Sequence, residues 1–320
     1  MERDLKREQL KALERQNAIA EGKLDLVSMA RAWISNPNFG RLAYEGRGED
    51  VVPCLRCNKC HVNTIHGPYL SVCSVNPEYG LEHQLKKMAP APVTTPRKIA
   101  VIGGGPAGME AAIDLCDRGH QVTLFEQQGE LGGLIRHADF VDFKWTLKQF
   151  KDYMVRKTLE NPNIQVRFYS RVEPGQLTGY DKVIVAIGAD PIVLPIPGHD
   201  RANVMTGIDA LNAPEKVKGT VAVIGGGEIG VEVGMFLAKQ GHPATVLEMR
   251  DKLAADATPI HYYNMVEDAW LHCEGFSFLL KAKVTGITES GVTYLDEAGT
   301  EHTLAADTVI MAVGTRSRKD

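Results

Sequence analysis

The 320-residue sequence has no strong excess of either charge and no long apolar run. Its 36 basic and 40 acidic residues give a net charge of -4, so no basic excess points to nucleic acid as a partner. No apolar stretch approaches the length that a bilayer span requires. The charged N-terminus, MERDLKREQLKALERQ, also lacks the apolar region of a signal peptide. These absences predict a cytoplasmic protein that binds neither membranes nor nucleic acid.

Cysteine is scarce, with six residues, but four of them fall within the twenty-residue stretch CLRCNKCHVNTIHGPYLSVC. Cys54, Cys57, Cys60 and Cys73 have the spacing C-x2-C-x2-C-x12-C. Disulfides fit a reducing cytoplasm poorly, so metal ligation is the first interpretation. Thiolates suit iron–sulfur clusters or zinc, and zinc sites usually use two separated C-x2-C pairs, so the tight triplet favours a [4Fe-4S] cluster. Zinc ligation and a cysteine-rich loop without metal are the alternatives.

The segments around these cysteines are expected to differ in structure. Residues 1–17 are predicted to form a charged helix, and residues 24–27 a short buried strand that leads into another helix. The stretch KKMAPAPVTTPRK, residues 86–98, is rich in proline and has no periodicity, so it is expected to be a linker. The two isolated thiols, Cys116 and Cys273, are predicted to be buried structural residues.

The stretch KIAVIGGGPAGMEAAIDLCDRGHQVTLFE predicts a mononucleotide-binding unit. An apolar strand is followed by Gly103-x-Gly105-x-x-Gly108, then by a helix, and then by a second strand that ends at Glu126. The glycines permit a tight turn and a close approach of the backbone to a pyrophosphate, and the helix N-terminus attracts the phosphate charge. Glu126 lies eighteen residues after the last glycine, where its carboxylate can accept hydrogen bonds from ribose hydroxyls.

The same layout recurs in GTVAVIGGGEIGVEVGMFLAKQGHPATVLEM. Gly225, Gly227 and Gly230 are followed by Glu248, again eighteen residues after the last glycine. Two such folds in one chain imply two adenine dinucleotides, and the natural chemistry is hydride transfer from a nicotinamide to a flavin. The alternative is that one copy, mainly the second, is a structural relic.

In the order of these motifs the chain resembles a known family. From about residue 18 to the end it is similar to the C-terminal two-thirds of the NADH:flavin oxidoreductases typified by 2,4-dienoyl-CoA reductase, trimethylamine dehydrogenase and the bile-acid enoate reductases. The carrying features are LDLVSMARAWISNP, the cysteine loop and the two GGG units. The cysteine spacing resembles the trimethylamine dehydrogenase variant. In this family a (β/α)8 barrel holds FMN and the substrate, a [4Fe-4S] cluster lies beside it, and FAD and NAD(P)H domains follow.

The resemblance implies a role for each matching residue. By this resemblance, the cluster ligands are Cys54, Cys57, Cys60 and Cys73; the FMN-phosphate residues are Ala30 and Arg31; the FAD residues are Gly103, Gly105, Gly108, Glu126, Gly132 and Gly133; and the NAD residues are Gly225, Gly227, Gly230 and Glu248. No catalytic side chain is assigned, because the strands that would carry one in the family have no counterpart here.

The expected fold class is α/β, with two Rossmann-like, doubly wound domains preceded by an iron–sulfur loop and a remnant of a (β/α)8 barrel. The expected domains are residues 1–45 (helix and barrel remnant), 46–96 (cysteine loop and linker), 97–215 (FAD domain without its C-terminal segment) and 216–320 (NAD(P) domain). Nearly the whole barrel is missing, so the sequence is expected to be a fragment or one subunit of a split enzyme. FMN would then be bound only with a separate barrel partner.

The predicted function is an electron-input module that passes hydride from NAD(P)H to FAD and single electrons through the cluster toward an FMN ene-reductase site. NADH is favoured because Glu248 would repel the extra phosphate of NADPH, although Arg250 could pair with that phosphate. One alternative is a small-subunit reductase that serves a partner enzyme. Another is a protein that binds dinucleotides without turnover.

Overall fold

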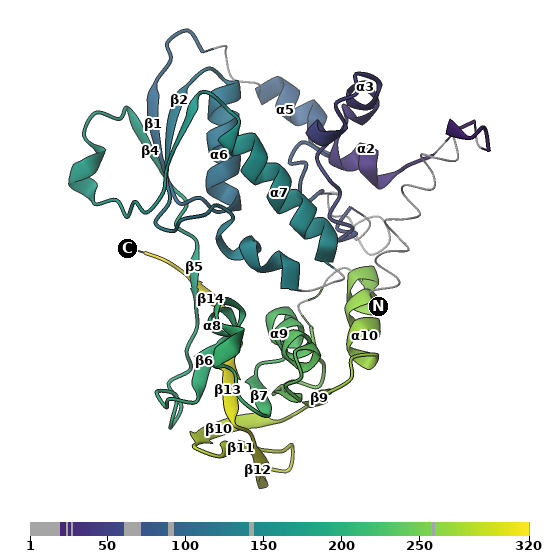
Figure 1. Cartoon of the computed structure of the whole chain (residues 1–320), viewed down its shortest axis with the longest axis vertical. Helices are drawn as coiled ribbons and strands as arrows, with labels where there is room; N and C mark the ends of the chain where they lie inside the picture. The colour runs from purple at the N-terminus through teal and green to yellow at the C-terminus, as the bar shows by residue number, and fades with distance from the viewer. Residues whose placement is uncertain are drawn as a thin grey trace. The chain divides into compact units, whose positions relative to one another are not determined.

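The protein, represented by a computed structural model, consists of two compact units, residues 1–187 and 188–320 (Figure 1). The structure describes residues 20–23, 25, 26, 28–60, 72–88, 93–140, 144–255, 257 and 260–319. The charged helix predicted for residues 1–17 lies outside this range. Of the helices in the described part, none combines the length and the apolarity that a membrane span requires.

Unit 1 is built on a four-stranded parallel sheet with the strand order β3-β2-β1-β4. Its elements, in chain order, are α2 (Arg31–Ser35), α3 (Phe39–Tyr44), η1 (Gly48–Asp50), α5 (Glu82–Met88), β1 (Lys98–Ile102), α6 (Pro106–Asp117), β2 (Gln121–Phe125), η2 (Gly133–Phe140), α7 (Trp145–Leu159), β3 (Ile164–Arg167), η4 (Pro174–Leu177) and β4 (Lys182–Val185). Both β1 and β2 are five-residue apolar strands, and α6 connects them as the GGG pattern predicts.

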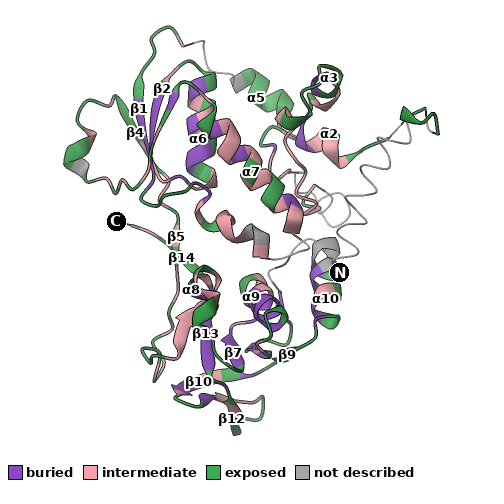
Figure 2. Ribbon diagram, in the orientation of Figure 1, coloured by how far each residue is buried: buried purple, intermediate pink, exposed green. Residues whose placement is uncertain are grey.

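The core of unit 1 lies between this sheet and helices α6 and α7, which pack against one another and against the strands (Figure 2). It contains Val101 from β1, Leu124 from β2, Met109 and Ala112 from α6, and Met154 from α7. Burial on this scale stabilises by about 1.5–3 kcal/mol for each large apolar side chain. The helix α6 therefore cannot move away from β1 without exposing this core.

Two expectations for the first hundred residues need correction. Leu26, expected in a buried strand, is 87% exposed and lies in no strand, while residues 24 and 27 of the same segment are outside the described range. Of the linker expected over residues 86–98, residues 86–88 belong to α5 and Lys98 belongs to β1, while residues 89–92 lie outside the described range. A few apolar residues thus did not suffice to specify a strand without a neighbouring strand to pair with.

Unit 2 is built on a five-stranded parallel sheet with the order β6-β13-β7-β8-β9. Its elements are β5 (Ala189–Pro191), β6 (Val204–Thr206), α8 (Gly207–Asn212), η5 (Pro214–Lys216), β7 (Val221–Ile224), α9 (Glu228–Lys239), β8 (Ala244–Leu247), α10 (Ile260–Leu271), β9 (Phe276–Leu279), β10 (Lys283–Thr288), β11 (Gly291–Leu295), β12 (Glu301–Ala305), β13 (Thr308–Met311) and β14 (Thr315–Ser317). Strands β5 and β14 form a separate antiparallel pair.

The central strands of unit 2 are buried on both faces. All four residues of β7 are buried, and α9 packs against β7 and β8. Residues of the other face of β7, Ala222 and Ile224, join a core cluster with Ile287 and Val292 of the antiparallel sheet β10-β11-β12. Near-continuous apolar strands such as VAVI are typical of parallel sheets covered on both faces.

The boundary between the units falls earlier than the expected boundary between residues 215 and 216. Residues 188–215, assigned from the sequence to the first domain, belong to unit 2. The reason is the parallel pairing of β6 with β13, in which Val204 is opposite Val309. Such a pairing between distant segments leaves no local sequence signal.

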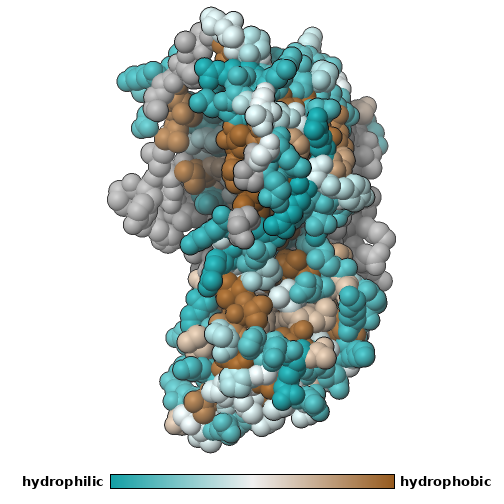
Figure 3. Space-filling view, turned by 90° about the vertical axis from the view of Figure 1, so that its left-hand side faces the viewer, coloured by the Kyte–Doolittle hydropathy of each residue, from teal (hydrophilic) through white to brown (hydrophobic). Residues whose placement is uncertain are grey.

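Among the described strands, β4 is at the edge of the sheet of unit 1 and pairs with β1. Val183 and Val185 on this strand are both exposed. The face of the molecule shown in Figure 3 is mixed, with separate brown apolar patches among teal hydrophilic side chains. Edge strands offer unpaired backbone groups as well as side chains to whatever covers them.

Candidate functional site

The first glycine turn connects β1 to α6 and closes the first nucleotide cradle, defined here as residues 103–108, Glu126 and residues 131–133. Gly103 has a φ of 106°, which favours glycine. A Cβ atom at Gly108 would overlap the carbonyl oxygen of Gly103, so the helix can pack against the turn only with glycine there. Gly105 is the N-cap of α6 and has no side chain to cap it, so the first N–H groups of the helix can face a phosphate.

Glu126, directly after β2, is 7% exposed and its carboxylate ties the cradle together. One oxygen accepts a hydrogen bond from the backbone N–H of Gly104 at 2.7 Å, and the other accepts from the N–H of Gln128 at 2.7 Å. An ionised carboxylate has about four lone-pair sites, so two sites remain for ligand hydroxyls. The predicted ribose acceptor is thus held rigidly at the edge of the turn.

The glycine pair of GELGG also reaches the turn. The N–H of Gly132 donates to the carbonyl of Gly104 at 2.9 Å. A Cβ at Gly133, whose φ is 53°, would lie 2.8 Å from the Cα of Gly105. The two backbone segments can therefore approach one another this closely only with glycine at position 133, as expected for a residue that lines a cofactor.

The second nucleotide cradle, residues 225–230 with Glu248 and residues 253–255, repeats this construction between β7, α9 and β8. Gly225 has a φ of 104°, and a Cβ at Gly230 would overlap its carbonyl oxygen. Gly227 is the N-cap of α9, with nearly the same backbone angles as Gly105 in the first cradle. The predicted positions of the three glycines thus form the same turn twice.

Glu248, 4% exposed, repeats the contacts of Glu126 with one addition. One oxygen accepts from the N–H of Gly226 at 2.7 Å, and the other accepts from the N–H of Arg250 at 2.8 Å. The Arg250 guanidinium also donates to this second oxygen, at 3.2 Å through Nε. The extra charge pair has no counterpart at Gln128.

The loops after the two acids also match, a repeat that the two glycine motifs did not indicate. Leu131 and Leu253, each five residues after the acid, are buried against Gly104 and Gly226. The N–H of Ala254 donates to the carbonyl of Gly226 at 2.7 Å, as Gly132 does to Gly104. Aligning EQQGELGG with EMRDKLAA would have revealed this repeat from the sequence.

The four clustered cysteines line one pocket in unit 1. All six cysteines of the chain are free thiols, and Cys116 and Cys273 are buried as predicted. The backbone N–H of Arg56 donates to Cys54 Sγ at 3.4 Å, and Cys57 Sγ lies 3.3 Å from the Ser74 hydroxyl. Arg56 and Asn58 have φ values of 57° and 55°, so the loop turns sharply on either side of Cys57.

The pocket lies beside Arg31. Its Nη1 donates to the Asn58 side-chain oxygen at 2.7 Å, and both residues line the pocket. Burial raises the pKa of the Cys54 thiol and of the Cys60 thiol above their ordinary value, and the Arg31 charge opposes this for Cys54. A metal centre must displace these thiol protons when it binds.

The donor set is of the kind that iron–sulfur clusters use, namely four thiols with a backbone N–H directed at one sulfur. Within the described range, no three His, Cys, Asp or Glu side chains lie close enough together to hold a single metal ion. The four thiols therefore line one pocket without being arranged around a common point.

The predicted FMN residues lie at the start of α2. Ala30 is the N-cap, and Arg31 begins the helix and uses one guanidinium nitrogen on Asn58. The guanidinium has five N–H donors, so others are left for a phosphate. The FMN assignment stays a prediction, while the contact of Arg31 with the cysteine loop is an observed feature that sequence spacing did not suggest.

Comparison with known proteins agrees with the two cradles. Residues 97–320 match the family model described as pyridine nucleotide-disulphide oxidoreductase. An NADH oxidase of Thermoanaerobacter brockii is 32% identical over 307 residues, which cover 92% of this chain and 46% of that protein. A cinnamate reductase of Clostridium sporogenes is 30% identical over 320 residues, which cover 95% of this chain and 45% of that protein.

A solved structure of a 2-naphthoyl-CoA reductase complex superposes on 94% of this chain and 45% of its own, with a TM-score of 0.88 and 27% identity. The chain spans less than half the length of these relatives. The relatives confirm the resemblance predicted from the cysteine loop and the two GGG units. Because the family model covers more than half of the sequence, this chain belongs to the pyridine nucleotide-disulphide oxidoreductase family, with its FAD- and NAD-binding α/β fold.

Proposed function

We propose that this chain is the electron-input part of an NADH-dependent flavoprotein reductase. The first cradle would hold FAD, the second would hold NADH, and Cys54, Cys57, Cys60 and Cys73 would hold a [4Fe-4S] cluster. When bound, the flavin supplies the conversion of a hydride into single electrons, and the cluster supplies a one-electron carrier. The observation that carries the proposal is the presence, in one chain, of two matching cradles and a pocket lined by four thiols.

The residues of this chain would bind and orient the two cofactors. Glu126 and Glu248 each accept two backbone N–H bonds, so their oxygens are fixed before a ribose arrives. The glycine turns leave room for pyrophosphate at the start of α6 and α9. Preorganised groups of this kind bind without further loss of conformational freedom.

A dithiol mechanism, which the family description suggests, has little support in this chain. The two cysteines outside the pocket, Cys116 and Cys273, lie in different units and are buried. Burial raises the pKa of the Cys116 thiol to about 11, which keeps it protonated and unreactive. Electrons are therefore proposed to leave by way of the four-cysteine pocket.

The proposed final acceptor is an FMN-binding barrel, as in the family that the sequence resembles, with an unsaturated acyl compound as the substrate class. The relatives named cinnamate reductase and 2-naphthoyl-CoA reductase are the support for this class. Arg31, beside the pocket, is the proposed FMN-phosphate contact of this chain.

The test is rapid anaerobic mixing of NADH with protein that has been reconstituted with FAD, iron and sulfide. Bleaching of the oxidised flavin absorbance followed by the EPR signal of a reduced cluster is the expected result. If the flavin stays oxidised, the chain would instead be a protein that binds dinucleotides without turnover. Metal analysis of the purified protein separates iron from zinc.

A Cys57→Ser variant sharpens this experiment. It should lose most of its iron and acid-labile sulfide but still show flavin bleaching by NADH, because the cradles contain no cysteine. The matched control is Cys116→Ser, which removes a thiol outside the pocket. Full iron retention in the Cys57→Ser variant would contradict the assignment of the pocket.

A further inference from the structure

Helix α7 contacts the chain around the cysteines at both of its ends. Its C-terminal end carries Arg156 and Lys157, and its N-terminal end carries Trp145 and Thr146. The helix also packs against η2, which begins at Gly133 of the first cradle. Helix α7 therefore contacts both the segment that begins in the first cradle and the chain around the cysteines.

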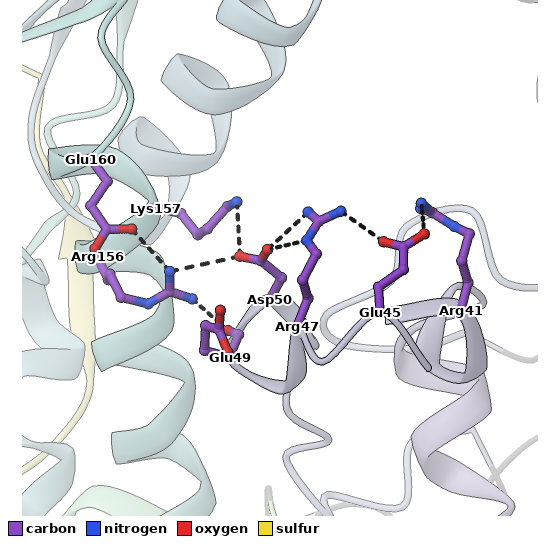
Figure 4. A network of polar contacts seen from close by, with 8 residues as sticks. All are labelled: Arg41, Glu45, Arg47, Glu49, Asp50, Arg156, Lys157 and Glu160. Carbon is purple, nitrogen blue, oxygen red and sulfur yellow. Dashed lines mark hydrogen bonds and ion pairs between the residues drawn. The ribbon is translucent and has the colours of Figure 1, made fainter. Parts of the chain in front are cut away.

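The C-terminal contact is an ionic network around Asp50 (Figure 4). Asp50 pairs with Lys157 at 3.4 Å, with Arg156 at 3.7 Å and with Arg47 at 2.8 Å. Arg156 also donates to the backbone carbonyl of Glu49. This network attaches the chain to α7 four residues before Cys54.

The N-terminal contact is made by Thr146, which is 4% exposed. Its hydroxyl donates to the backbone carbonyl of Leu55 at 2.9 Å. Leu55 lies between the first two cysteines of the triplet and lines the pocket itself. Beside it, the Arg56 guanidinium lies 5.7 Å from the centre of the Trp145 ring, a cation–π contact.

The two contacts anchor the chain at Asp50 and at Leu55, on either side of Cys54. Residues 52–58 form neither helix nor strand, so side-chain contacts rather than a backbone ladder hold them in place. Arg56 and Asn58 have positive φ values, so the chain turns directly after the Thr146 contact. Thr146 therefore holds the chain at the point where the turn between Cys54 and Cys57 begins.

We propose that Thr146 is a positioning residue for the four-cysteine site. By holding the Leu55 carbonyl, its hydroxyl sets the turn in which the Arg56 N–H points at Cys54 Sγ and Asn58 reaches Arg31. The thiols are thereby ordered before any metal centre binds. The inference rests on the proposed function only for the identity of that centre.

The test compares three variants. Thr146→Val removes the hydroxyl at nearly constant shape, and Thr146→Ser keeps it. Thr158→Val is the matched control, because Thr158 is a fully buried threonine on the same helix whose hydroxyl donates to Met154 of the helix itself. The readouts are the rate at which a thiol reagent modifies the metal-free chain, iron and sulfide content after reconstitution, and the EPR line shape of the reduced centre.

In Thr146→Val the metal-free thiols should react about threefold to tenfold faster, the factor that corresponds to one lost hydrogen bond. The same variant should take up less iron and show a broadened EPR signal, whereas Thr146→Ser and Thr158→Val should behave like the parent protein. Equal behaviour of Thr146→Val and the parent would overturn the proposal. So would equal defects in Thr146→Val and Thr158→Val, or no rescue by serine.

The metal-free readout separates this inference from the proposed function. A parent protein that takes up zinc, or no metal, would end the cluster assignment. The thiol reaction rates of the three variants would still decide the role of Thr146.

Discussion

The two nucleotide cradles of this chain are nearly the same structure built twice. Both have a positive-φ glycine after the first strand, a glycine whose Cβ would overlap the turn, and a buried glutamate that accepts two backbone N–H bonds. In both, a buried leucine packs against the second glycine of the GGG run. The shared part is what any adenine dinucleotide requires, namely room for pyrophosphate and a fixed acceptor for ribose.

Two of the differences between the cradles are informative. The first has the glycine pair 132–133 after its leucine, where the second has Ala254 and Ala255. The second has Arg250 bonded to its glutamate, where the first has Gln128. We interpret the glycine pair as the mark of the flavin site and the arginine as the mark of the nicotinamide site.

The largest effect is expected from alanine at the third glycine of each turn. Gly108→Ala should abolish FAD binding and lower the free energy of unfolding by about 2–3 kcal/mol, because the new methyl group forces α6 off β1. Gly230→Ala should do the same to NADH binding. Flavin content, NADH titration and urea unfolding measure these effects, with Gly175→Ala as the control, since a Cβ there meets open space. Loss of both ligands in either variant would show that the cradles are not independent.

The second effect concerns the two acids. Glu126→Gln should weaken FAD binding by about tenfold to a hundredfold, because the amide NH2 faces one of the two backbone N–H donors in place of an acceptor. Glu248→Gln should weaken NADH binding by a similar factor. Equilibrium titration of each ligand measures both. If either variant binds its ligand as tightly as the parent protein, the ribose assignment of that acid is wrong.

The third effect tests the glycine pair. Gly133→Ala should weaken FAD binding by about tenfold, because it adds the cost of a positive φ to a methyl group 2.8 Å from Gly105. The reciprocal change, Ala255→Gly in the second cradle, should leave NADH binding unaltered. Flavin fluorescence titration checks the first and NADH titration the second. An unaltered FAD affinity would remove the main distinction between the two sites.

The smallest effect is expected at the position two residues after each acid. Arg250→Ala should change NADH affinity by less than about threefold, because the side chain is half exposed and such ion pairs contribute little. Turnover with NADH should exceed turnover with NADPH in the parent protein. If NADPH proves to be used as well, and Arg250→Ala abolishes only that use, the predicted preference must be reversed. Gln128→Arg serves as the matched change in the first cradle.

Much of the fold and the cradles could be predicted because the signals are local. The strand, glycine turn, helix and acid are specified within thirty residues, and their period and turn chemistry do not depend on the rest of the chain. The spacing of the first three cysteines is an equally local signal. The buried strand predicted for residues 24–27 was wrong at Leu26, which lies in no strand and is exposed.

The amino-acid sequence alone determined that this chain forms two glycine turns, each followed by an acid eighteen residues after its last glycine, and that four thiols lie close together. Only the tertiary structure decided what holds these parts in place. Thr146 meets Leu55 across 91 residues, and Arg31 meets Asn58 across 27 residues. The pairing of β6 with β13 shifts the boundary between the units. Contacts of this kind depend on loop closure and on packing between segments that are distant in the chain, and neither leaves a periodic pattern in the residues themselves.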